Sequence, residues 1–462
     1  YSIAGGEYNV AVGNYTLDAL TSGDNNIAIG YEAGGALSTG GENVFIGSYA
    51  VSTGVHTGSN NIAIGRLAGQ DLTSSGNNVI MGWSAAKQAT TPDNSVILGA
   101  GACGLGTLTG NNNVVIGQEA GEDMTSALDN VVIGYLAGNE MTTGAKSVLI
   151  GRSAGAASTT NTDGFVAIGH QAGLSNTSGG SIFIGNDAGK INTTGSANIS
   201  IGYQAYDNAD TETNNLAIGT DALGGAVAGG EYNTAVGNFT LDELTSGDSN
   251  TCFGYGAGSA ITLSDRNCCF GESAGGSITT GGENIMIGQN SGNAHTALTT
   301  GDSNIFIGEK INAGAAGRLR SIVIGTPNSQ SKGDNTTFIS ANGGTSFNGG
   351  NTTTWDQTSD RRIKKNIVDN NTGLDAINKI QVRNFEYRTL EEITDFDSPE
   401  AAMVDKQGTQ LGAIAQEIEE ILPDLITETS QGVKTLNADN LTWYLINAVK
   451  ELSAEIKVLK GE

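Results

Sequence analysis

Ser359 and Lys364, five residues apart, are the two side chains whose types and spacing suggest covalent chemistry. A serine hydroxyl attacks a carbonyl carbon only when a base removes its proton. No histidine follows His295, so an imidazole cannot be that base in the part of the chain after Ser359. A neutral lysine amine can take this role, as it does in the serine–lysine variants of the catalytic triad. The pair therefore predicts a serine nucleophile and a lysine base.

The surroundings of the pair favour this chemistry. Arg361, Arg362 and Lys365 lie close in sequence, and nearby positive charge or burial makes a lysine easier to deprotonate. The stretch also marks a seam, because a Gly- and Asn-rich region precedes it and an ordinary mixed sequence follows it. A processing point is one interpretation. The other is a helix-capping serine beside a solvated lysine, since a serine and a lysine at this spacing are common.

A short pattern recurs before the seam: Asn or Ser, three apolar residues, then Gly, as in residues 26–30. The closing glycines fall at 13, 30, 47, 65, 82, 99, 117, 134, 151, 169, 185, 202, 219, 237, 254, 271, 288, 308 and 325. So short and regular a period predicts a solenoid. The triplets are rich in β-branched residues and too short for helices, so we expect one strand per coil. Nineteen parallel coils at ~4.8 Å each make a rod of roughly 90 Å.

The residues around each triplet have turn chemistry. The glycine after a strand permits a sharp corner, and Ser/Thr-Gly pairs such as Thr39-Gly40 form the opposite turns. The Asn before each strand predicts a ladder of stacked side-chain amides. Ala-Gly pairs such as Ala33-Gly34 supply the small residues that a tight coil needs. A longer duplication is also present, because residues 5–23 and 229–247 match at 16 of 19 positions.

The apolar triplets predict the oligomeric state. Side chains alternate faces along a strand, so we expect Ile27 and Ile29 to point into the coil and Ala28 to point outward. The outward residue is apolar in nearly every coil, with Ser200 as the clear departure, and so long an apolar stripe needs a cover. A homotrimer of solenoids provides one. The predicted interface residues of the shaft are Ala28, Phe45, Ala63, Val115, Leu149, Phe183, Met286 and Phe306.

Charge excludes several partners. The chain has 22 basic and 48 acidic residues, a net charge of −26, and 29 of the acidic but only 10 of the basic residues precede Ser359. Such a chain has no footprint for nucleic acid or an anionic membrane surface. No apolar run is long enough to span a bilayer. We therefore expect neither nucleic-acid binding nor membrane insertion.

Neither cofactor nor metal is predicted. The four cysteines match no metal spacing, and we expect small buried side chains in a reducing compartment, although Cys252 and Cys269 occupy equivalent positions of adjacent repeats and can touch. The three histidines, His56, His170 and His295, are scattered, and we expect them to be solvated. Carboxylates recur near the Asn column, at Asp24, Glu42, Asp248, Glu283 and Asp302. They leave calcium between coils as an alternative, but the register of calcium-binding β-rolls is absent.

The repeat resembles the head repeats of trimeric autotransporter adhesins. Asn-Ile-Ala-Ile-Gly, at residues 26–30, carries the resemblance, which extends over about 320 residues. The repeat of that family is shorter than the 17 residues found here. The resemblance implies a left-handed parallel β-roll packed as a homotrimer.

The chain after the repeats divides into a junction, residues 326–358, and a C-terminal domain, residues 359–462. Phe338, Phe347 and Trp355 in the junction favour a small β-element that caps the rod. In the domain we expect a strand over 382–387 and helices over 411–422 and 438–460. The second helix has a coiled-coil seam, which adds to the predicted trimer interface. Its residues are Leu445, Val449, Leu452, Ile456 and Leu459.

The domain resembles the C-terminal intramolecular chaperone of phage tailspikes, tail fibres and endosialidases. Residues 359–367, 412–417 and 422–423, and the final Leu-rich helix, carry this resemblance. It implies that the domain trimerises, guides folding of the shaft and releases itself with a Ser–Lys dyad. Ser359 and Lys364 are then catalytic, and the cut lies between Thr358 and Ser359.

The combined prediction is a trimeric viral tail fibre or tailspike shaft that attaches to a host-cell surface receptor, either a glycan or a surface protein. We expect it in the virion, with the chaperone released in the host cytoplasm during assembly. The first alternative is a bacterial surface adhesin, or another β-roll protein, with the same chaperone. The second is a glycan-cleaving tailspike. It is disfavoured because no coil breaks the pattern to place the required pair of carboxylates.

Overall fold

The computed structural model describes residues 5–159, 163–341, 344–348, 361, 364–394, 404, 407–428 and 432–461. The chain divides into two compact units, Tyr1–Thr358 and Ser359–Glu462. Of the expected junction anchors, Trp355 lies outside the described residues, and only the backbone of Phe347 is described.

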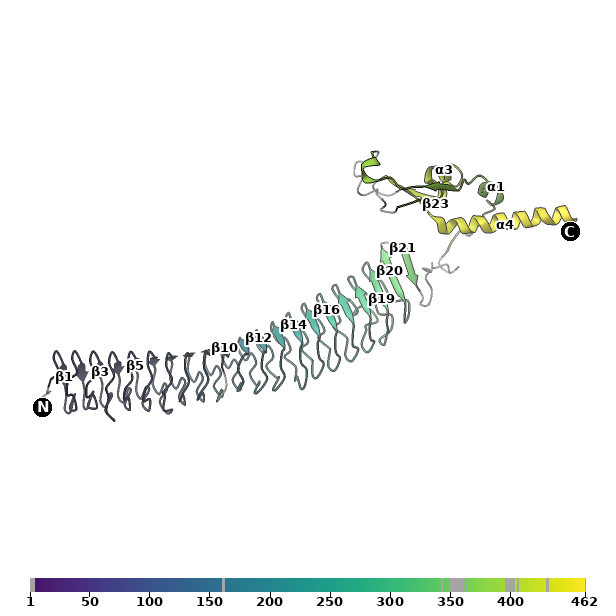
Figure 1. The fold of residues 1–462 in the computed structure, drawn as a ribbon. Coiled ribbons are helices and arrows are strands. Elements are labelled where there is room, and N and C mark those ends of the chain that lie inside the picture. Colours follow the sequence, from purple (N-terminus) through teal and green to yellow (C-terminus); the bar gives the residue numbers. More distant parts are fainter. Residues whose placement is uncertain are drawn as a thin grey trace. The chain divides into compact units, whose positions relative to one another are not determined.

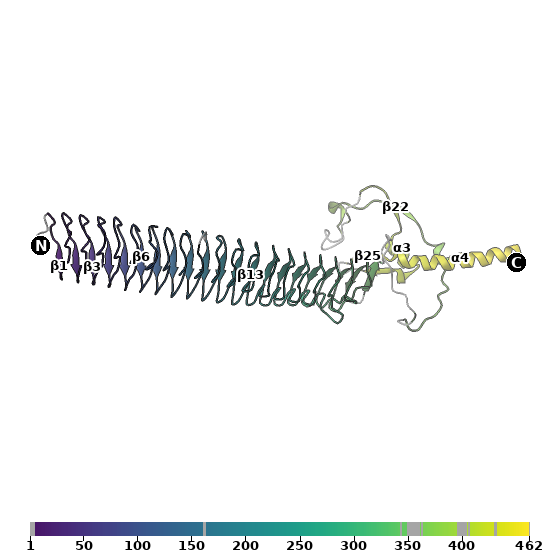
Figure 2. The same cartoon turned by 90° about the horizontal axis from the view of Figure 1, so that it is seen from below.

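The first unit is a parallel β-solenoid, as predicted, with one strand per coil (Figure 1). Each triplet pairs in register with the triplet one coil away, so that Ala28 lies beside Ala11 and Phe45. The strands are β1 (Val10–Val12), β2 (Ile27–Ile29), β3 (Val44–Ile46), β4 (Ile62–Ile64), β5 (Val79–Met81), β6 (Val96–Leu98), β7 (Val114–Ile116), β8 (Val131–Ile133), β9 (Val148–Ile150), β10 (Val166–Ile168), β11 (Ile182–Ile184), β12 (Ile199–Ile201), β13 (Leu216–Ile218), β14 (Thr234–Val236), β15 (Thr251–Phe253), β16 (Cys268–Phe270), β17 (Ile285–Ile287), β18 (Ile305–Ile307) and β19 (Ile322–Gly325). The strands follow one another along one side of the stack (Figure 2).

The predicted direction of the triplet side chains is wrong. The middle residue of each triplet from β2 to β19 is buried inside its own coil, and the first and third residues face outward. The proposed shaft interface residues are therefore core residues of a single chain: Ala28, Phe45, Ala63, Val115, Leu149, Phe183, Met286 and Phe306. Ser200 is buried as well, and its hydroxyl donates to the carbonyl of Ala205 at 2.6 Å. The side chains do alternate between the two faces of the strand, as predicted. A run of three apolar residues does not show, however, whether the middle residue or the two outer residues point into the coil.

The Asn ladder is confirmed. The side-chain oxygen of Asn26 accepts from both the backbone N–H and the side-chain amide of Asn43, at 3.1 and 3.0 Å. That amide also donates to the carbonyl of Gly58 at 3.1 Å, which ties the strand to the opposite turn of the next coil. From Asn26 to Asn304 the ladder asparagines are buried and hydrogen-bonded, as an interior amide must be to avoid a desolvation penalty.

Two constraints at each strand end require glycine. Gly117, after β7, has φ +142°, a region that side chains with a Cβ rarely adopt. A Cβ built there lies 2.4 Å from the carbonyl oxygen of Gly134 in the next coil. The corner glycine thus both turns the chain and lets neighbouring coils stack.

The interior also holds a histidine that the sequence placed at the surface. His56 is fully buried, one coil from Leu37, and its ring packs edge-on against Phe45 at 5.8 Å. His170 and His295 are exposed, as expected. Cys252 and Cys269 are buried, unbridged and paired in register, as expected for small core residues.

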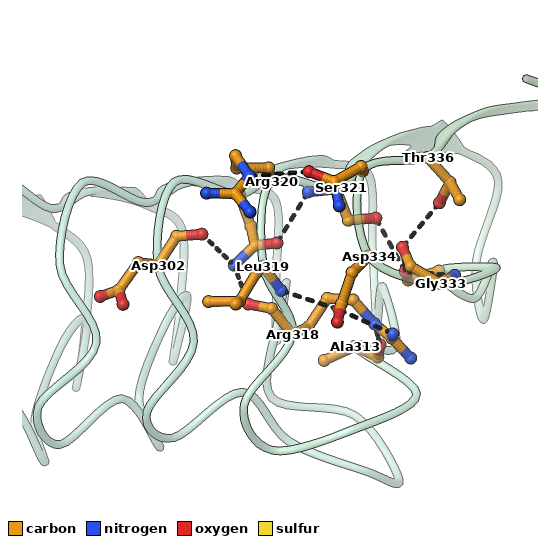
Figure 3. A network of polar contacts seen from close by, with 12 residues as sticks. Asp302, Ala313, Arg318, Leu319, Arg320, Ser321, Gly333, Asp334 and Thr336 are labelled. Atoms are coloured by element: carbon orange, nitrogen blue, oxygen red, sulfur yellow. Dashed lines mark hydrogen bonds and ion pairs between the residues drawn. The ribbon is translucent and has the colours of Figure 1, made fainter. Parts of the chain in front are cut away.

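The last coils are held by charge as well as by the ladder (Figure 3). Arg318 pairs with Asp334 at 3.0 Å and donates through Nε to the carbonyl of Ala313 at 3.0 Å. Asp334 also accepts from the N–H of Leu319 at 3.1 Å. That backbone hydrogen bond, followed by Arg318, lowers the pKa of Asp334.

The stack continues beyond the last predicted repeat. Strand β20 (Thr337–Ala341) pairs parallel with β19, and β21 (Gly344–Asn348) folds back antiparallel on β20. Phe338 is buried beside Val323 and extends the core column by one position. This hairpin agrees with the expected β-element at the end of the rod.

The second unit is small and mixed. Its elements are α1 (Leu374–Ile377), β22 (Arg383–Phe385), β23 (Gln410–Gly412), α3 (Ala415–Glu419), β24 (Ile426–Glu428), β25 (Lys434–Leu436) and α4 (Ala438–Lys460), with 3₁₀ turns at Leu390–Glu392 and Pro423–Leu425. Strands β22 and β23 form one antiparallel pair, and β24 and β25 another. The core residues are Ala376, Ile418, Leu422, Leu425 and Tyr444.

Two of the three elements expected in this unit are confirmed. The 382–387 stretch contains β22, and α4 spans the predicted 438–460. Asn437 caps α4 by accepting from the N–H of Asn440 at 3.2 Å, and Gly461 ends it at φ +74°. The helix predicted over 411–422 is wrong in its first part, because Leu411 pairs with Asn384 in the β22–β23 ladder. The cross-strand ladder takes residues whose apolar spacing alone resembles a helix.

Candidate processing site and association surfaces

The predicted dyad is only partly described. Thr358 and Ser359 lie outside the described residues, so no distance joins the proposed nucleophile to its base. Lys364 is exposed, and its backbone N–H donates to the carbonyl of Arg361 at 3.2 Å. Lys365 is exposed too, and Arg362 lies outside the described residues. The Ser–Lys chemistry therefore remains a prediction.

The segment that follows Lys364 is anchored to α4. The side-chain amide of Asn447 donates to the carbonyls of Asn370 and Thr372, at 2.7 and 3.2 Å. Glu451, one turn further along the helix, accepts from the N–H of Leu374 at 2.6 Å. These bonds position the start of the domain against its last helix.

Gly373 makes this approach possible. A Cβ built at this position lies 2.5 Å from a carboxylate oxygen of Glu451 and 2.8 Å from the backbone nitrogen of Ala448. Ala448 is itself small and buried on the same side of α4. The N-terminal end of α1 therefore packs closely on α4, because Gly373 and Ala448 are both small.

Asn447, Glu451 and Gly373 were missed by the sequence reasoning. A glycine directly before a short helix and two polar residues one turn apart on a long helix are the only signals they leave. Neither signal identifies the partner, because about 75 residues separate the contacting segments in sequence.

Tyr444 links α4 to the turn after α3. Its hydroxyl donates to the carboxylate of Asp424, and this hydrogen bond is the main cause that raises the pKa of Tyr444. A hollow of about 180 Å³ lies beside this pair, lined by Asn370, Asp424, Asn440, Trp443, Tyr444 and Asn447. Since Asn370 and Asn447 also make an anchoring contact, the hollow belongs to the docking of the first segment on α4.

Two ion pairs fix the position of α3. Arg383 of β22 donates two hydrogen bonds to the carboxylate of Glu417, from Nη2 at 2.9 Å and from Nε at 3.3 Å. Lys434 of β25 pairs with Glu419. All four side chains are partly exposed, so each pair stabilises the fold only modestly. They orient the helix between the two strand pairs.

The predicted coiled-coil seam of α4 faces away from its own domain. Tyr444 and Ala448 are the buried residues of this helix. Every residue of the seam is exposed: Leu445, Val449, Leu452, Ile456 and Leu459. A row of five exposed apolar side chains on one helix is a surface suited to association.

The shaft has a second apolar surface, which the sequence reasoning assigned to the wrong residues. The first and third residues of the triplets line the outer face of the strands, as with Ile27 and Ile29 of β2 and Ile199 and Ile201 of β12, all exposed. Nearly all of these positions are apolar from β1 to β19. We call these two rows the outer columns.

The recurring carboxylates of the shaft serve its turns. Asp24, Asp248 and Asp302 each accept a backbone N–H from the preceding coil, from Glu7, Glu231 and Gly282, at 2.7, 2.8 and 2.7 Å. Among the described residues, no three His, Cys, Asp or Glu side chains gather closely enough to hold a metal ion. None of the described helices combines the length and the apolar character needed to cross a bilayer.

Comparison with known proteins bears on the second unit. No curated protein matches the chain. Residues 359–427 match the model of the family described as chaperone of endosialidase. The match begins at Ser359, which is also the first residue of the C-terminal unit. Behind a long parallel β-solenoid shaft, residues 359–427 thus match the family of the tailspike-like chaperone domain that the sequence predicted.

Proposed function

We propose that the chain is a trimeric tail fibre or tailspike shaft for host attachment, and that its C-terminal domain directs trimer folding and then cuts itself off between Thr358 and Ser359. The observation that carries this proposal is the family match starting at Ser359, behind a stack of nineteen coils. A chaperone domain and a β-solenoid shaft fit a structural protein of this kind.

Two apolar surfaces support self-association. The outer columns run along the shaft, and the exposed seam of Leu445, Leu452 and Ile456 runs along α4. Apolar stripes of this length are covered by other chains in stable proteins. Three parallel copies bury both surfaces at once, because each copy presents the same columns and the same seam. The left-handed coil predicted by resemblance is part of this proposal.

The proposed cleavage is an acyl transfer followed by hydrolysis. Neutral Lys364 takes the proton of the Ser359 hydroxyl, and the oxygen attacks the carbonyl carbon of Thr358. The peptide bond breaks as an ester forms, and the Ser359 amine leaves with a proton. Water then hydrolyses the ester, so that the shaft ends in a carboxylate at Thr358 and the domain begins with Ser359.

The test is the fate of the purified full-length chain. We expect two fragments by mass spectrometry, the second starting at Ser359. Ser359→Ala removes the nucleophile and Lys364→Ala removes the base, so each variant stays uncleaved yet trimeric. Lys364→Arg also stays uncleaved, because a guanidinium does not give up its proton near neutral pH. Lys379→Ala, which removes an exposed lysine fifteen residues further along the chain, is the matched control and should cleave normally.

Normal cleavage in Lys364→Ala overturns the dyad. A cut at another bond leaves the chaperone assignment in place and removes the autoproteolytic activity.

A further inference from the structure

Exposed aromatic rings contact one another edge to face along one corner of the shaft. Tyr15 and Tyr31 lie on successive coils with ring centroids 5.7 Å apart and planes at 83°. Tyr49 continues the row, 5.2 Å from Tyr31. Tyr15 is 48% exposed and Tyr31 40%. Large rings are usually buried, so a row of rings in edge-to-face contact in solvent needs a reason.

The arrangement occurs twice. The duplication of residues 5–23 at 229–247 replaces Tyr15 by Phe239, and Tyr31 recurs at the same offset as Tyr255. The second pair has nearly the same geometry, with centroids 5.7 Å apart and planes at 77°. The supporting hydrogen bond is repeated too. Thr16 donates to the carbonyl of Gly30 at 2.8 Å, and Thr240 to that of Gly254 at 2.6 Å.

Carboxylates and a hydroxyl border the first pair. A shallow groove of about 260 Å³ is lined by Tyr15, Asp18, Tyr31, Glu32, Gly35 and Ser52. The Tyr31 hydroxyl is hydrogen-bonded to Glu32, which is the main cause that raises the pKa of Tyr31 to about 12. At the second pair, Asp242 stands where Asp18 stands at the first, whereas Gly256 and Gly276 stand at the positions of Glu32 and Ser52. Flat apolar rings thus lie beside groups that accept hydrogen bonds.

We propose that the Tyr15–Tyr31 and Phe239–Tyr255 pairs are two related binding sites for an uncharged, pyranose-containing glycan. The C–H face of a sugar ring packs on an aromatic ring, and its hydroxyls donate to carboxylates. The inference rests on the proposed host-attachment function and names the class of its receptor.

Charge selects the uncharged glycan. The shaft has 29 acidic and 10 basic residues before Ser359, and both groove carboxylates, Asp18 and Glu32, are negative. A sialylated or uronic-acid polymer is repelled by such a surface, whereas a neutral sugar is not. A second copy of the chain is a poor occupant for the same reason, because it has to bury these carboxylates without a cation. The pairs also lie after the triplets, outside the outer columns.

The distance between the two sites allows one chain to bind a long glycan at both sites. Strands β1 and β14 precede the two pairs, and thirteen coils at ~4.8 Å place the pairs roughly 60 Å apart along the stack. One long polysaccharide, or a surface crowded with short ones, engages both sites together. Binding to an immobilised glycan is then much tighter than binding to a short soluble oligomer.

The test uses the full-length chain on immobilised neutral hexose and N-acetylhexosamine oligosaccharides, beside sialic acid oligomers. We expect binding to one or more neutral glycans and none to the sialic acid oligomers. Tyr31→Ala and Tyr255→Ala should each weaken binding about tenfold, and the double variant more than either. Tyr31→Leu, which keeps the bulk but not the ring, should weaken it similarly.

Tyr203→Ala is the matched control. Tyr203 is 51% exposed, also follows the corner glycine of its coil, and has no ring stacked on it within the described residues. Its loss should leave binding unchanged.

Several outcomes overturn the inference. They are no neutral glycan bound by the folded chain, a preference for the anionic oligomers, or a double variant that binds like the wild type. A change of assembly mass in Tyr31→Ala also overturns it, since the rings then belong to the interface between copies. Light scattering on the same samples separates the two proposals, because a glycan-binding monomer contradicts the trimer and leaves these sites standing.

Discussion

His56 shows how a single residue departs from its column. It lies inside the shaft, in contact with Phe45 and 3.5 Å from the side-chain amide of Asn61. Burial lowers its pKa to about 4, although the nearby backbone of Leu72 and Thr73 acts in the opposite direction. A charged imidazole is therefore unfavourable in the folded coil.

The pH dependence of stability follows from this shift. An unfolded chain binds a proton at His56 near pH 6.5, whereas the folded chain does so only near pH 4. As the pH falls through this window the unfolded state binds more protons, so the folded state loses stability, by roughly 3 kcal/mol at most. Above the window the loss disappears.

His56→Leu should flatten that dependence, because a leucine already occupies the adjacent coil at Leu37. We expect the thermal midpoint of the variant to fall less than that of the wild type between pH 7.5 and pH 4.5. His170→Gln, which changes an exposed histidine, is the control and should behave as the wild type does. If both variants lose stability equally on acidification, His56 is not the group that titrates.

At the scale of the element, the triplets separate two kinds of apolar residue. Ile27 and Ile64 belong to the outer columns, whereas Ala28 fills the coil. Replacing Ile27 and Ile64 together by Glu should break assembly and leave the coil intact, because the carboxylates stay solvated in a separated chain. Ala28→Glu should instead disrupt the coil, since its charge has no partner inside.

The measurement combines light scattering with circular dichroism, in a Ser359→Ala background that keeps the chain uncleaved. We expect the wild-type chain to have three times the 47.0 kDa chain mass and the outer-column variant to have less, with an unchanged β spectrum. Leu105→Glu, an exposed apolar position off the strands, is the control. A folded monomer for the unmodified chain contradicts the role of the outer columns.

The elements also differ in how well the sequence predicted them. Period, strand position, corner glycines and the Asn ladder follow from local rules, because each coil repeats the same contacts with its neighbour. The direction of the triplet side chains could not be predicted in this way. Ile27, Ala28 and Ile29 are all apolar, and only the turn geometry decides which of them points into the coil. The anchoring of Gly373 by Glu451 was unpredictable for a different reason: it joins segments distant in sequence.

For the candidate site, the sequence supplied residue types and order. Ser359 and Lys364 were identified from the stretch that also begins the family match. Their geometry does not follow from spacing, because it depends on how the first segment of the domain lies against other elements. Asn447 and Glu451 are the described part of that positioning.

At the scale of the whole molecule, the shaft and the chaperone differ in what they need in order to fold. Nearly every strand of the shaft pairs with one about 17 residues away, and none is stable until its neighbours are in place. An incomplete stack exposes strand edges and apolar columns, which favours aggregation. In the proposed trimer, three chains must also start in register, because a slip by one coil leaves similar columns in contact and is not rejected by sequence.

The proposed trimerisation of the C-terminal domain removes that ambiguity, because it fixes one end of all three chains. We therefore expect a chain that ends at Thr358 to aggregate or misassemble when it is produced alone. The same shaft, released from the full-length chain after folding, should remain assembled, because separating long paired columns is slow and the trimer is kinetically stable. The comparison is made by light scattering and by resistance to protease on equal amounts of the two materials. Efficient assembly of the truncated chain into protease-resistant trimers contradicts a chaperone role for residues 359–462. If protease digests the released shaft as fast as the truncated chain, the released shaft is not kinetically stable. A chaperone that is cut off after folding requires that stability.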